Sequence, residues 1–462
     1  MTTDGQTDPV SAGSSLPESE GEAGATLPAS VQSERANAGR ENPGQTDRLM
    51  ERVAEPANLN EAWRRVRSNG GAPGIDGVTV EQYPRLLAGR TEALRRRLLE
   101  GSYQPSALRR VKIPKPNGGE RQLGIPTVED RLVQQAILQV LQPILDPTFS
   151  AHSYGFRPNR SAHQAIEAAQ AYIQEDYDWV VDLDLEAFFD RVHHDRLMSR
   201  LGQHVADKRM RWIIRRFLQA GVMENGVVMP TREGTPQGGP LSPLLANLVL
   251  DELDHELEER GLRFVRYADD CNVYVRSERA AKRAFQNLTA FIETTLKLKV
   301  NHAKSAVARP WERKLLGFSF TPKTRKQPVK RKIATKALDK AKDRIRELTR
   351  DGHHDFRRTM DGLRRYLNGW LGYFGRCQTP SVLKALAQWT RRRLRALIWR
   401  RWKTSERRLH ELLRRGLNRD SALKLVGSSD GPWHLSRTQA LSVALPNVWF
   451  ASHGLPSFSC RS

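Results

Sequence analysis

The sequence contains few cysteines and no long apolar segment, and both absences limit the kinds of protein that it can encode. Its 462 residues include three cysteines, Cys271, Cys377 and Cys460, which form no CxxC pair. A cysteine-based structural zinc site and a disulfide framework are therefore not expected. No apolar run has the length of a membrane-spanning helix, and the N-terminus lacks the basic and apolar regions of a secretory signal. We expect a cytoplasmic protein without a membrane partner.

Acidic residues are scarce relative to basic ones. The chain has 75 Lys and Arg against 52 Asp and Glu, which gives a formal net charge of +23. An excess of this size favours a polyanionic partner, and with no membrane segment the expected polyanion is nucleic acid.

Residues 1–50 differ from the rest of the chain in composition. They contain no lysine and few large apolar residues, and they are rich in Gly, Ser, Thr, Ala, Pro and Glu. Such a segment cannot bury enough surface to offset the entropy lost on ordering. We expect a disordered, acidic, low-complexity tail.

After the tail, local patterns predict a mixture of helices and strands. Asn60 is expected to cap a helix that ends at 69–71. Further helices are predicted at 130–145, 243–260 and 282–296. Strands are predicted at 108–114 and 122–125, joined by a turn at 116–119, and also at 179–185 and around 315–318. From about Ile333 onward the pattern is helical and basic, with Trp and Tyr interleaved.

The most informative stretch is Tyr-Ala-Asp-Asp at 267–270. Apolar and β-branched residues flank it on both sides, which predicts a β-hairpin with the acids at its turn. Adjacent like charges at a tight turn repel unless a cation neutralises them, and hard cations such as Mg²⁺ take oxygen ligands. A solvated acidic turn remains the alternative, because Asp is a common turn residue.

A second acid, Asp184, lies at the end of the apolar strand at 179–185. Taken alone, it is equally well explained as a helix N-cap. A central antiparallel sheet would bring Asp184 beside Asp269. Three carboxylates there could hold two Mg²⁺ ions about 3.5–4 Å apart, as in polymerases.

Two nearby groups carry weaker signals. Asp182 shares a strand face with Asp184, so we expect it to act only indirectly. His193 and His194 are adjacent in a predicted helix and must point to different faces, which favours a helix surface over a metal site.

Several motifs in register resemble those of a known family. The segments 184–190, 235–243 and 267–270 resemble reverse transcriptases in order and spacing. Upstream, 113–116, 123–127 and 154–158 resemble bacterial group II intron-encoded proteins. Downstream, 369–374 and 391–403 resemble the maturase region of the same family. The resemblance covers about residues 58–456 and is to group II intron-encoded reverse transcriptase/maturases. The sequence stops at Ser462 without cysteine pairs, which suggests the form lacking the C-terminal HNH endonuclease.

The resemblance implies an α+β fold with the right-hand architecture of polymerases. Fingers and an antiparallel-sheet palm are expected at 51–330, a helical thumb with the maturase X region at 331–395, and a basic, helical nucleic-acid-binding region at 396–462.

The resemblance also assigns roles to single residues. Asp184, Asp269 and Asp270 correspond to the catalytic, metal-binding triad, with two Mg²⁺ ions as cofactors. The expected nucleotide-binding residues are Lys115, Arg121, Phe189 and Gln237. Phe189 could instead be an ordinary core residue, and Lys115 and Arg121 could be solvated loop residues. Gly238 and Gly239 are expected to let the backbone approach the nucleotide. Lys304 corresponds to a possible general acid, and residues 316–318 resemble the primer grip.

The basic residues near the end of the chain follow one predicted helix, with Leu394, Leu397, Ile398 and Trp402 as its apolar stripe. A solvated helix face would explain such a charge run, but few acids accompany it, and an unbalanced run favours phosphate contacts. The expected RNA- or DNA-binding residues are Arg391, Arg392, Arg393, Arg395, Arg400, Arg401 and Lys403.

The predicted function is that of an RNA-directed DNA polymerase that also acts as an intron maturase. Its expected partners are group II intron RNA, an RNA template, a DNA primer or target, and dNTPs, in association with the bacterial nucleoid. Two alternatives remain. One is an RNA-binding splicing cofactor that keeps the polymerase core as a scaffold, and the other is a retron-type reverse transcriptase. The sequence leaves the oligomeric state open.

Overall fold

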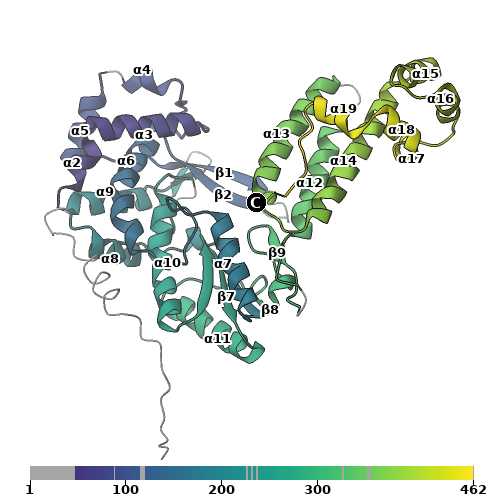
Figure 1. The fold of residues 1–462 in the computed structure, drawn as a ribbon. Coiled ribbons are helices and arrows are strands. Elements are labelled where there is room, and N and C mark those ends of the chain that lie inside the picture. Colours follow the sequence, from purple (N-terminus) through teal and green to yellow (C-terminus); the bar gives the residue numbers. More distant parts are fainter. Residues whose placement is uncertain are drawn as a thin grey trace, which may run out of the picture. The chain divides into compact units, whose positions relative to one another are not determined.

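The strands expected around the paired acids do pair with each other in the computed structural model (Figure 1). The central sheet is built from β3 (Trp179–Leu183), β6 (Arg263–Tyr267), β7 (Asp270–Val275) and β8 (Ala306–Ala308). Their order is β6-β7-β3-β8, and every neighbouring pair is antiparallel. The structure confirms the expected antiparallel palm sheet.

The structure describes residues 47–87, 89–114, 120–224, 227–229, 233–235, 238–324, 327–350 and 355–460. Lys115, Gln237 and the expected turn at 116–119 lie outside the described residues. So does the expected tail, apart from 47–50, where Leu49 and Met50 are buried at the start of α2 (Leu49–Ala54). The fold described below is that of the unit 46–462.

The two faces of the central sheet belong to different hydrophobic clusters. The helices packed near it are α6 (Val128–Leu145), α7 (Ala162–Gln174), α10 (Ser242–Glu259) and α11 (Glu278–Thr294). Successive side chains of a strand point to opposite faces. Accordingly, Val181 packs in a cluster with Leu288 of α11, whereas Val180 packs in a cluster with Ile166 of α7. Because apolar side chains cover both faces, the strand ends are the places where polar groups reach solvent.

The helical C-terminal region shares the second of these clusters. Its elements are β9 (Phe318–Phe320), β10 (Arg331–Ile333), α12 (Thr335–Leu348), α13 (Phe356–Phe374), α14 (Pro380–Arg401), α15 (Ser405–Arg414), α16 (Arg419–Val426), α17 (Pro432–Leu435), α18 (Gln439–Ala444) and α19 (Asn447–Ser452). Leu367 of α13 and Leu394 of α14 are fully buried in the same cluster as Val180. The helical pattern expected beyond Ile333 is confirmed.

A second sheet, in the order β2-β1-β4-β5, lies apart from the first. Its strands are β1 (Leu108–Pro114), β2 (Glu120–Ile125), β4 (Val222–Glu224) and β5 (Val227–Met229). β1 and β2 are antiparallel, with Ile113 opposite Arg121. The expected strand at 108–114 is confirmed, and the return strand begins two residues earlier than expected.

The first long helix begins earlier than the sequence suggested. We expected Asn60 to be its cap, but α3 (Pro56–Asn69) already contains that residue. The expectation was wrong because Pro56 occupies the first helical position, where its fixed φ suits a helix and its missing N–H is not needed. The end is as expected, since Gly70 takes the positive φ of 61° that stops the helix.

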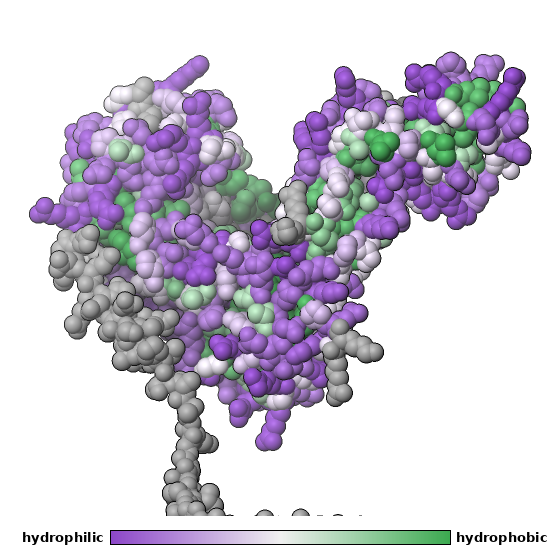
Figure 2. Space-filling model, in the orientation of Figure 1, coloured by the Kyte–Doolittle hydropathy of each residue, from purple (hydrophilic) through white to green (hydrophobic). Residues whose placement is uncertain are grey.

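The remaining helices are α4 (Tyr83–Leu87), α5 (Thr91–Leu99), α8 (His194–His204) and α9 (Lys208–Gln219). Among the described residues, no helix is both long and apolar enough to cross a membrane. Figure 2 shows hydrophilic residues over most of the visible surface, with a group of hydrophobic ones near α15 and α16.

Candidate active site

The turn between β6 and β7 presents the paired acids, and its backbone is strained. Tyr267 and Asp270 are partners across the hairpin, so Ala268 and Asp269 form the turn. Ala268 has a φ of 57°, in the left-handed region. This conformation costs an L-residue about 1–2 kcal/mol. Contacts elsewhere must therefore hold the turn in place.

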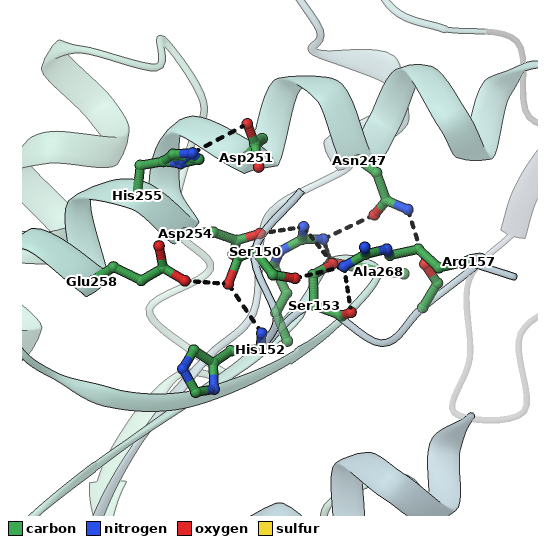
Figure 3. Close-up of polar contacts among 12 residues, drawn as sticks. Ser150, His152, Ser153, Arg157, Asn247, Asp251, Asp254, His255, Glu258 and Ala268 are labelled. Atoms are coloured by element: carbon green, nitrogen blue, oxygen red, sulfur yellow. Dashed lines mark hydrogen bonds and ion pairs between the residues drawn. The ribbon is translucent and has the colours of Figure 1, made fainter. Parts of the chain in front are cut away.

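Those contacts come from Arg266, which is fully buried. Its partners Ser153, Asn247, Asp254 and Ala268 are labelled in Figure 3. Its Nη1 donates to the carbonyl oxygen of Ala268 at 3.0 Å and to Asn247 Oδ1 at 3.0 Å. Its Nε and Nη2 donate to the two carboxylate oxygens of Asp254 at 2.7 and 2.5 Å, and Nη2 also donates to Ser153 Oγ at 2.8 Å. The guanidinium therefore links the turn to helix α10 and to the loop at 153–155.

The same loop packs directly against the turn. A Cβ atom on Gly155 would lie 2.3 Å from the backbone nitrogen of Ala268, closer than any side chain can come. Asn247 Nδ2 donates to the Gly155 carbonyl at 2.9 Å, and the Tyr154 N–H donates to the Arg266 carbonyl at 2.8 Å. Only glycine fits at position 155, so the backbone of this loop supports the turn from behind.

Asp184 follows the end of β3 on the neighbouring strand. Leu183 pairs with Cys271, which places Asp184 beside the β6–β7 turn. Its backbone N–H donates to Ser305 Oγ at 3.0 Å, and its carbonyl accepts from the Asn301 N–H at 2.8 Å. The sheet thus brings together acids that are far apart in sequence, as expected.

The carboxylates influence one another electrostatically. Asp184 and Asp270 line one pocket of about 710 Å³, together with Asp182. The pKa of Asp270 is raised to about 6, first by desolvation and then by the charges of Asp269, Asp182 and Asp184. Of these four acids, Asp182 is paired with Arg313 at 2.6 Å, and Asp184 lies 3.5 Å from Lys304. The mutual repulsion that helps to raise the pKa of Asp270 is the electrostatic feature that a bound cation would relieve.

The donor set fits a hard divalent cation. Carboxylate oxygens are the ligands that Mg²⁺ takes in proteins, and Asp184, Asp269 and Asp270 supply such oxygens. Within the ranges that the structure describes, no three His, Cys, Asp or Glu side chains already have the spacing of a metal cluster. The acids are therefore gathered by the fold but are not preset as a ligand cage.

Two further features expected in this region surround the same pocket. Lys304 Nζ lies 3.5 Å from Asp184 Oδ1. Leu316 and Gly317, from the segment that resembles a primer grip, also line the pocket. The Tyr373 hydroxyl donates to the Leu316 carbonyl at 2.8 Å, so helix α13 holds this segment in place.

Phe189 lies in a short 3₁₀ helix, η3 (Phe188–Asp190), and its ring is available to a ligand. Phe188 is 3% exposed and belongs to the core, whereas Phe189 is only partly buried and lines a second pocket of about 690 Å³. The Thr235 N–H donates to the Phe189 carbonyl at 2.6 Å. Phe189 therefore both packs against the core and lines this pocket, and its role in nucleotide binding stays a prediction.

His194 has a structural role that the sequence did not suggest. We expected His193 and His194 on a helix surface, but His194 is buried and its Nε2 lies 2.7 Å from the Gly234 carbonyl oxygen. The expectation was wrong for His194 because the loop at 233–235 folds back over the start of α8. This contact holds the loop that leads to the expected nucleotide-binding residue Gln237.

Gly238 and Gly239 make close approaches to the protein itself. A Cβ on Gly238 would lie 2.8 Å from the Gly124 carbonyl oxygen, and one on Gly239 would lie 2.3 Å from Gln134 Oε1. These glycines therefore let the loop pack against β2 and α6. For Arg121, the structure gives the backbone position opposite Ile113 in the β1–β2 hairpin.

The expected nucleic-acid-binding residues of α14 fall into two groups. Several of them bind other parts of the protein. Arg393 donates to Thr349 Oγ1 and Arg395 to the Leu445 carbonyl, while Arg392 and Arg401 lie over the rings of Trp433 and Phe356. Arg391 is partly buried, and Arg400 and Lys403 are exposed. Lys403 follows the last residue of the helix, Arg401.

Sequence reasoning missed the residues that hold the site in position. The turn is held in place by Arg266, Asn247 and Asp254, and none of these residues was expected in the site. One signal was present: Arg266 follows Phe264 and Val265 in an apolar strand. A charge in such a place needs a buried partner.

With this geometry established, comparison with known proteins defines the class. Residues 113–320 match the family "Reverse transcriptase (RNA-dependent DNA polymerase)", and residues 338–416 match "Group II intron, maturase-specific domain". The chain belongs to the family of reverse transcriptases that carry a group II intron maturase domain. It is an RNA-directed DNA polymerase with a function in intron splicing and mobility, and this function implies binding of intron RNA and of a template and primer.

The chain is also similar to particular proteins. The chain is 34% identical over 343 residues to Protein YkfC of Escherichia coli K12, covering 65% of this chain and 90% of the relative. It is 36% identical over 230 residues to the group II intron-encoded protein LtrA of Lactococcus lactis, covering 47% of this chain and 36% of LtrA. A structure of a partial Cas6-RT-Cas1–Cas2 complex is 26% identical, with a TM-score of 0.35, over 53% of this chain and 42% of that one.

The buried guanidinium gives a first prediction. Arg266→Met leaves the Asp254 carboxylate buried without its partner, which should destabilise the protein by about 3–5 kcal/mol. Chemical denaturation followed by circular dichroism should show a lower midpoint. Arg263→Met, at an exposed position of the same strand, is the matched control and should change stability by no more than about 0.5 kcal/mol. Equal midpoints for the two variants would contradict the role given to Arg266.

Proposed function

We propose that Asp184, Asp269 and Asp270 form the catalytic centre of this polymerase and hold two Mg²⁺ ions. The proposal rests on one observation: the end of β3 and the β6–β7 turn lie side by side, and Asp184 and Asp270 from these two segments line one pocket. When bound, the ions would lower the pKa of a primer 3′-hydroxyl and neutralise the pyrophosphate leaving group.

The surrounding residues have separate roles in this proposal. Lys304, beside Asp184, donates a proton to the leaving pyrophosphate. Lys115 and Arg121 bind the triphosphate, and Gln237 lies against the incoming nucleotide. Phe189 presents its ring to the sugar and excludes a 2′-hydroxyl. The support for Phe189 is its place on the wall of the 690 Å³ pocket, next to the core residue Phe188.

Primer extension on an RNA template with Mg²⁺ tests the catalytic centre. Asp269→Asn removes one negative charge at the turn, and cDNA synthesis should fall by at least about 10²-fold, the scale found when a group that stabilises reacting charge is lost. The control Asp343→Asn changes an exposed acid on α12 and should keep wild-type activity. If the wild type and Asp269→Asn give equally little cDNA while intron RNA still binds, the chain acts as a splicing cofactor with a polymerase scaffold.

The sugar gate has its own test. Phe189→Ala removes the ring that faces the pocket, so a ribonucleotide should be accepted more readily. The ratio of dNTP to rNTP incorporation, measured in single-nucleotide primer extension, should fall by at least about tenfold. Because both substrates are measured on the same variant, a general loss of folding lowers both rates and leaves the ratio unchanged. An unchanged ratio would mean that Phe189 is a packing residue.

We also propose that the basic C-terminal helices bind the phosphates of group II intron RNA, of target DNA, or of both, in association with the nucleoid. The exposed Arg400 and Lys403 are the strongest of the seven expected residues, because Arg392, Arg393, Arg395 and Arg401 already have partners within the protein. In this proposal residues 331–395 form the thumb and residues 396–462 form the C-terminal region. Helix α14 runs without a break across the boundary between them.

The salt dependence of RNA binding tests this interface. Arg400→Ala combined with Lys403→Ala should weaken intron RNA binding and lower the slope of log Kd against log salt by about 1.5, the value for two lost phosphate contacts. Arg408→Ala also removes a cation, but Arg408 donates to the Trp402 carbonyl at 2.8 Å. This control should lower thermal stability and leave the slope unchanged. Equal slopes for the wild type and the double variant would rule out direct phosphate contact by Arg400 and Lys403.

A further inference from the structure

Phe156 is a large aromatic residue in an unusual position. Its side chain is 50% exposed, and its φ is 58°, in the left-handed region that bulky residues rarely adopt. Burial does not explain the ring, because half of it is open to solvent. Strained residues of this kind persist where the surrounding structure fixes them, and they cluster at functional sites.

The residues on both sides of Phe156 are firmly held. Gly155 packs against Ala268 of the catalytic turn, and its carbonyl accepts from Asn247. Arg157, labelled in Figure 3, donates to Asp146 Oδ1 at 2.8 Å and to the Ser150 carbonyl at 2.5 Å. The backbone therefore presents the Phe156 ring in a fixed place. The ring centroid lies 6.3 Å from that of Tyr267, the first residue of the Tyr-Ala-Asp-Asp segment.

The ring separates two pockets. Phe156 lines the 690 Å³ pocket together with Phe189 and Gly238, and it also lines a further pocket of about 820 Å³ with Gln142 and Pro147. The acids Asp184 and Asp270 line a different pocket, which also contains Leu316 and Gly317. Phe156 therefore lies on the boundary between the pocket that Phe189 also lines and the 820 Å³ pocket.

We infer that Phe156 is a stacking platform for a nucleobase of the template strand, the unpaired base immediately beyond the one being copied. The inference rests on the proposed function, in which the primer end lies at the acids and the incoming nucleotide at Phe189. On that arrangement the template base next to the one being copied must lie beside the pocket of the incoming nucleotide, and Phe156 lines that pocket together with Phe189. An aromatic face suits this position because it stacks on every base and does not read sequence.

Binding of primer–template duplexes with different overhangs tests the platform. The full chain is titrated with two labelled DNA-primer/RNA-template duplexes, each with a template overhang of two nucleotides. The second overhang nucleotide carries a base in one duplex and is abasic in the other. The wild type should bind the duplex with the base about tenfold more tightly, as expected for one stacked base.

Three variants complete this test. Phe156→Ala should bring the ratio of the two dissociation constants close to one, and Phe156→Trp should keep the wild-type ratio. Val448→Ala, at an exposed apolar position in α19, should retain the wild-type ratio.

Two further measurements separate stacking from a structural role. With 2-aminopurine as the second overhang base, the wild type should quench its fluorescence and Phe156→Ala should not. Phe156→Gly removes both the ring and the left-handed strain, so its melting temperature should be equal to or above that of the wild type while its binding ratio falls to one. A wild-type ratio near one, an unchanged ratio in Phe156→Ala, or a lower melting temperature in Phe156→Gly would overturn the inference.

The same experiments distinguish failure of the platform from failure of the proposed polymerase. If the wild type extends the primer but binds both duplexes equally, the catalytic proposal stands and the platform does not exist. If it discriminates between the duplexes but makes no cDNA with Mg²⁺, the platform stands and the catalytic proposal fails.

Discussion

The guanidinium of Arg266 is charged, fully buried and bonded by each of its three nitrogens. Burial alone would lower the pKa of Arg266, but the Asp254 carboxylate outweighs that effect and raises it. A buried ion pair stabilises a fold only when all of its hydrogen bonds are made together, because each unpaired member is costly. This condition fixes helix α10, the loop at 153–155 and the carbonyl of Ala268 in one arrangement. The strained turn that carries Asp269 and Asp270 depends on it.

Charged side chains have different surroundings on the two sides of this turn. Behind it, Arg266 and Asp254 neutralise each other away from water. In front of it, Asp184 and Asp270 line a pocket whose wall also carries Lys304, Arg313 and Lys314. Lys304 lies 3.5 Å from Asp184, and Arg313 lies 2.6 Å from Asp182. The acids of the candidate site therefore meet their counter-charges where solvent can reach them, whereas the pair of Arg266 and Asp254 is fully enclosed.

The sequence predicted those parts of the site that depend on local pattern. The strands around Asp184 and the Tyr-Ala-Asp-Asp hairpin follow from alternation of apolar residues, and their pairing follows from the small number of ways in which antiparallel strands can join. The supporting contacts were not predictable, because Asn247 and Asp254 lie on a helix whose rotation only the packed structure decides. His194 was misjudged for the same reason, because its partner, Gly234, comes from another segment.

The basic C-terminal helices show why composition cannot locate an interface. A net charge of +23 indicates a polyanionic partner, but it does not say which cations are available to bind one. Arg393 and Arg395 use their guanidinium groups on Thr349 and the Leu445 carbonyl, so they act as links between helices. Arginine suits this use because its long apolar stem can be buried while its planar head makes several hydrogen bonds.

Backbone strain marks the site more sharply than charge does. Among the described residues, seven that are not glycine have a positive φ, and four of them lie in the candidate site or next to its residues: Phe156, Ala187, Ala268 and Leu316. Ala187 precedes the 3₁₀ helix that presents Phe189, and Leu316 lines the pocket of Asp184. Two of them are held by contacts from distant segments, Leu316 by the Tyr373 hydroxyl and Ala268 by the backbone at Gly155. Strain that persists in this way positions a side chain or a carbonyl that an unstrained turn would aim elsewhere. The strained residues therefore lie at, or within two residues of, the side chains of the candidate site.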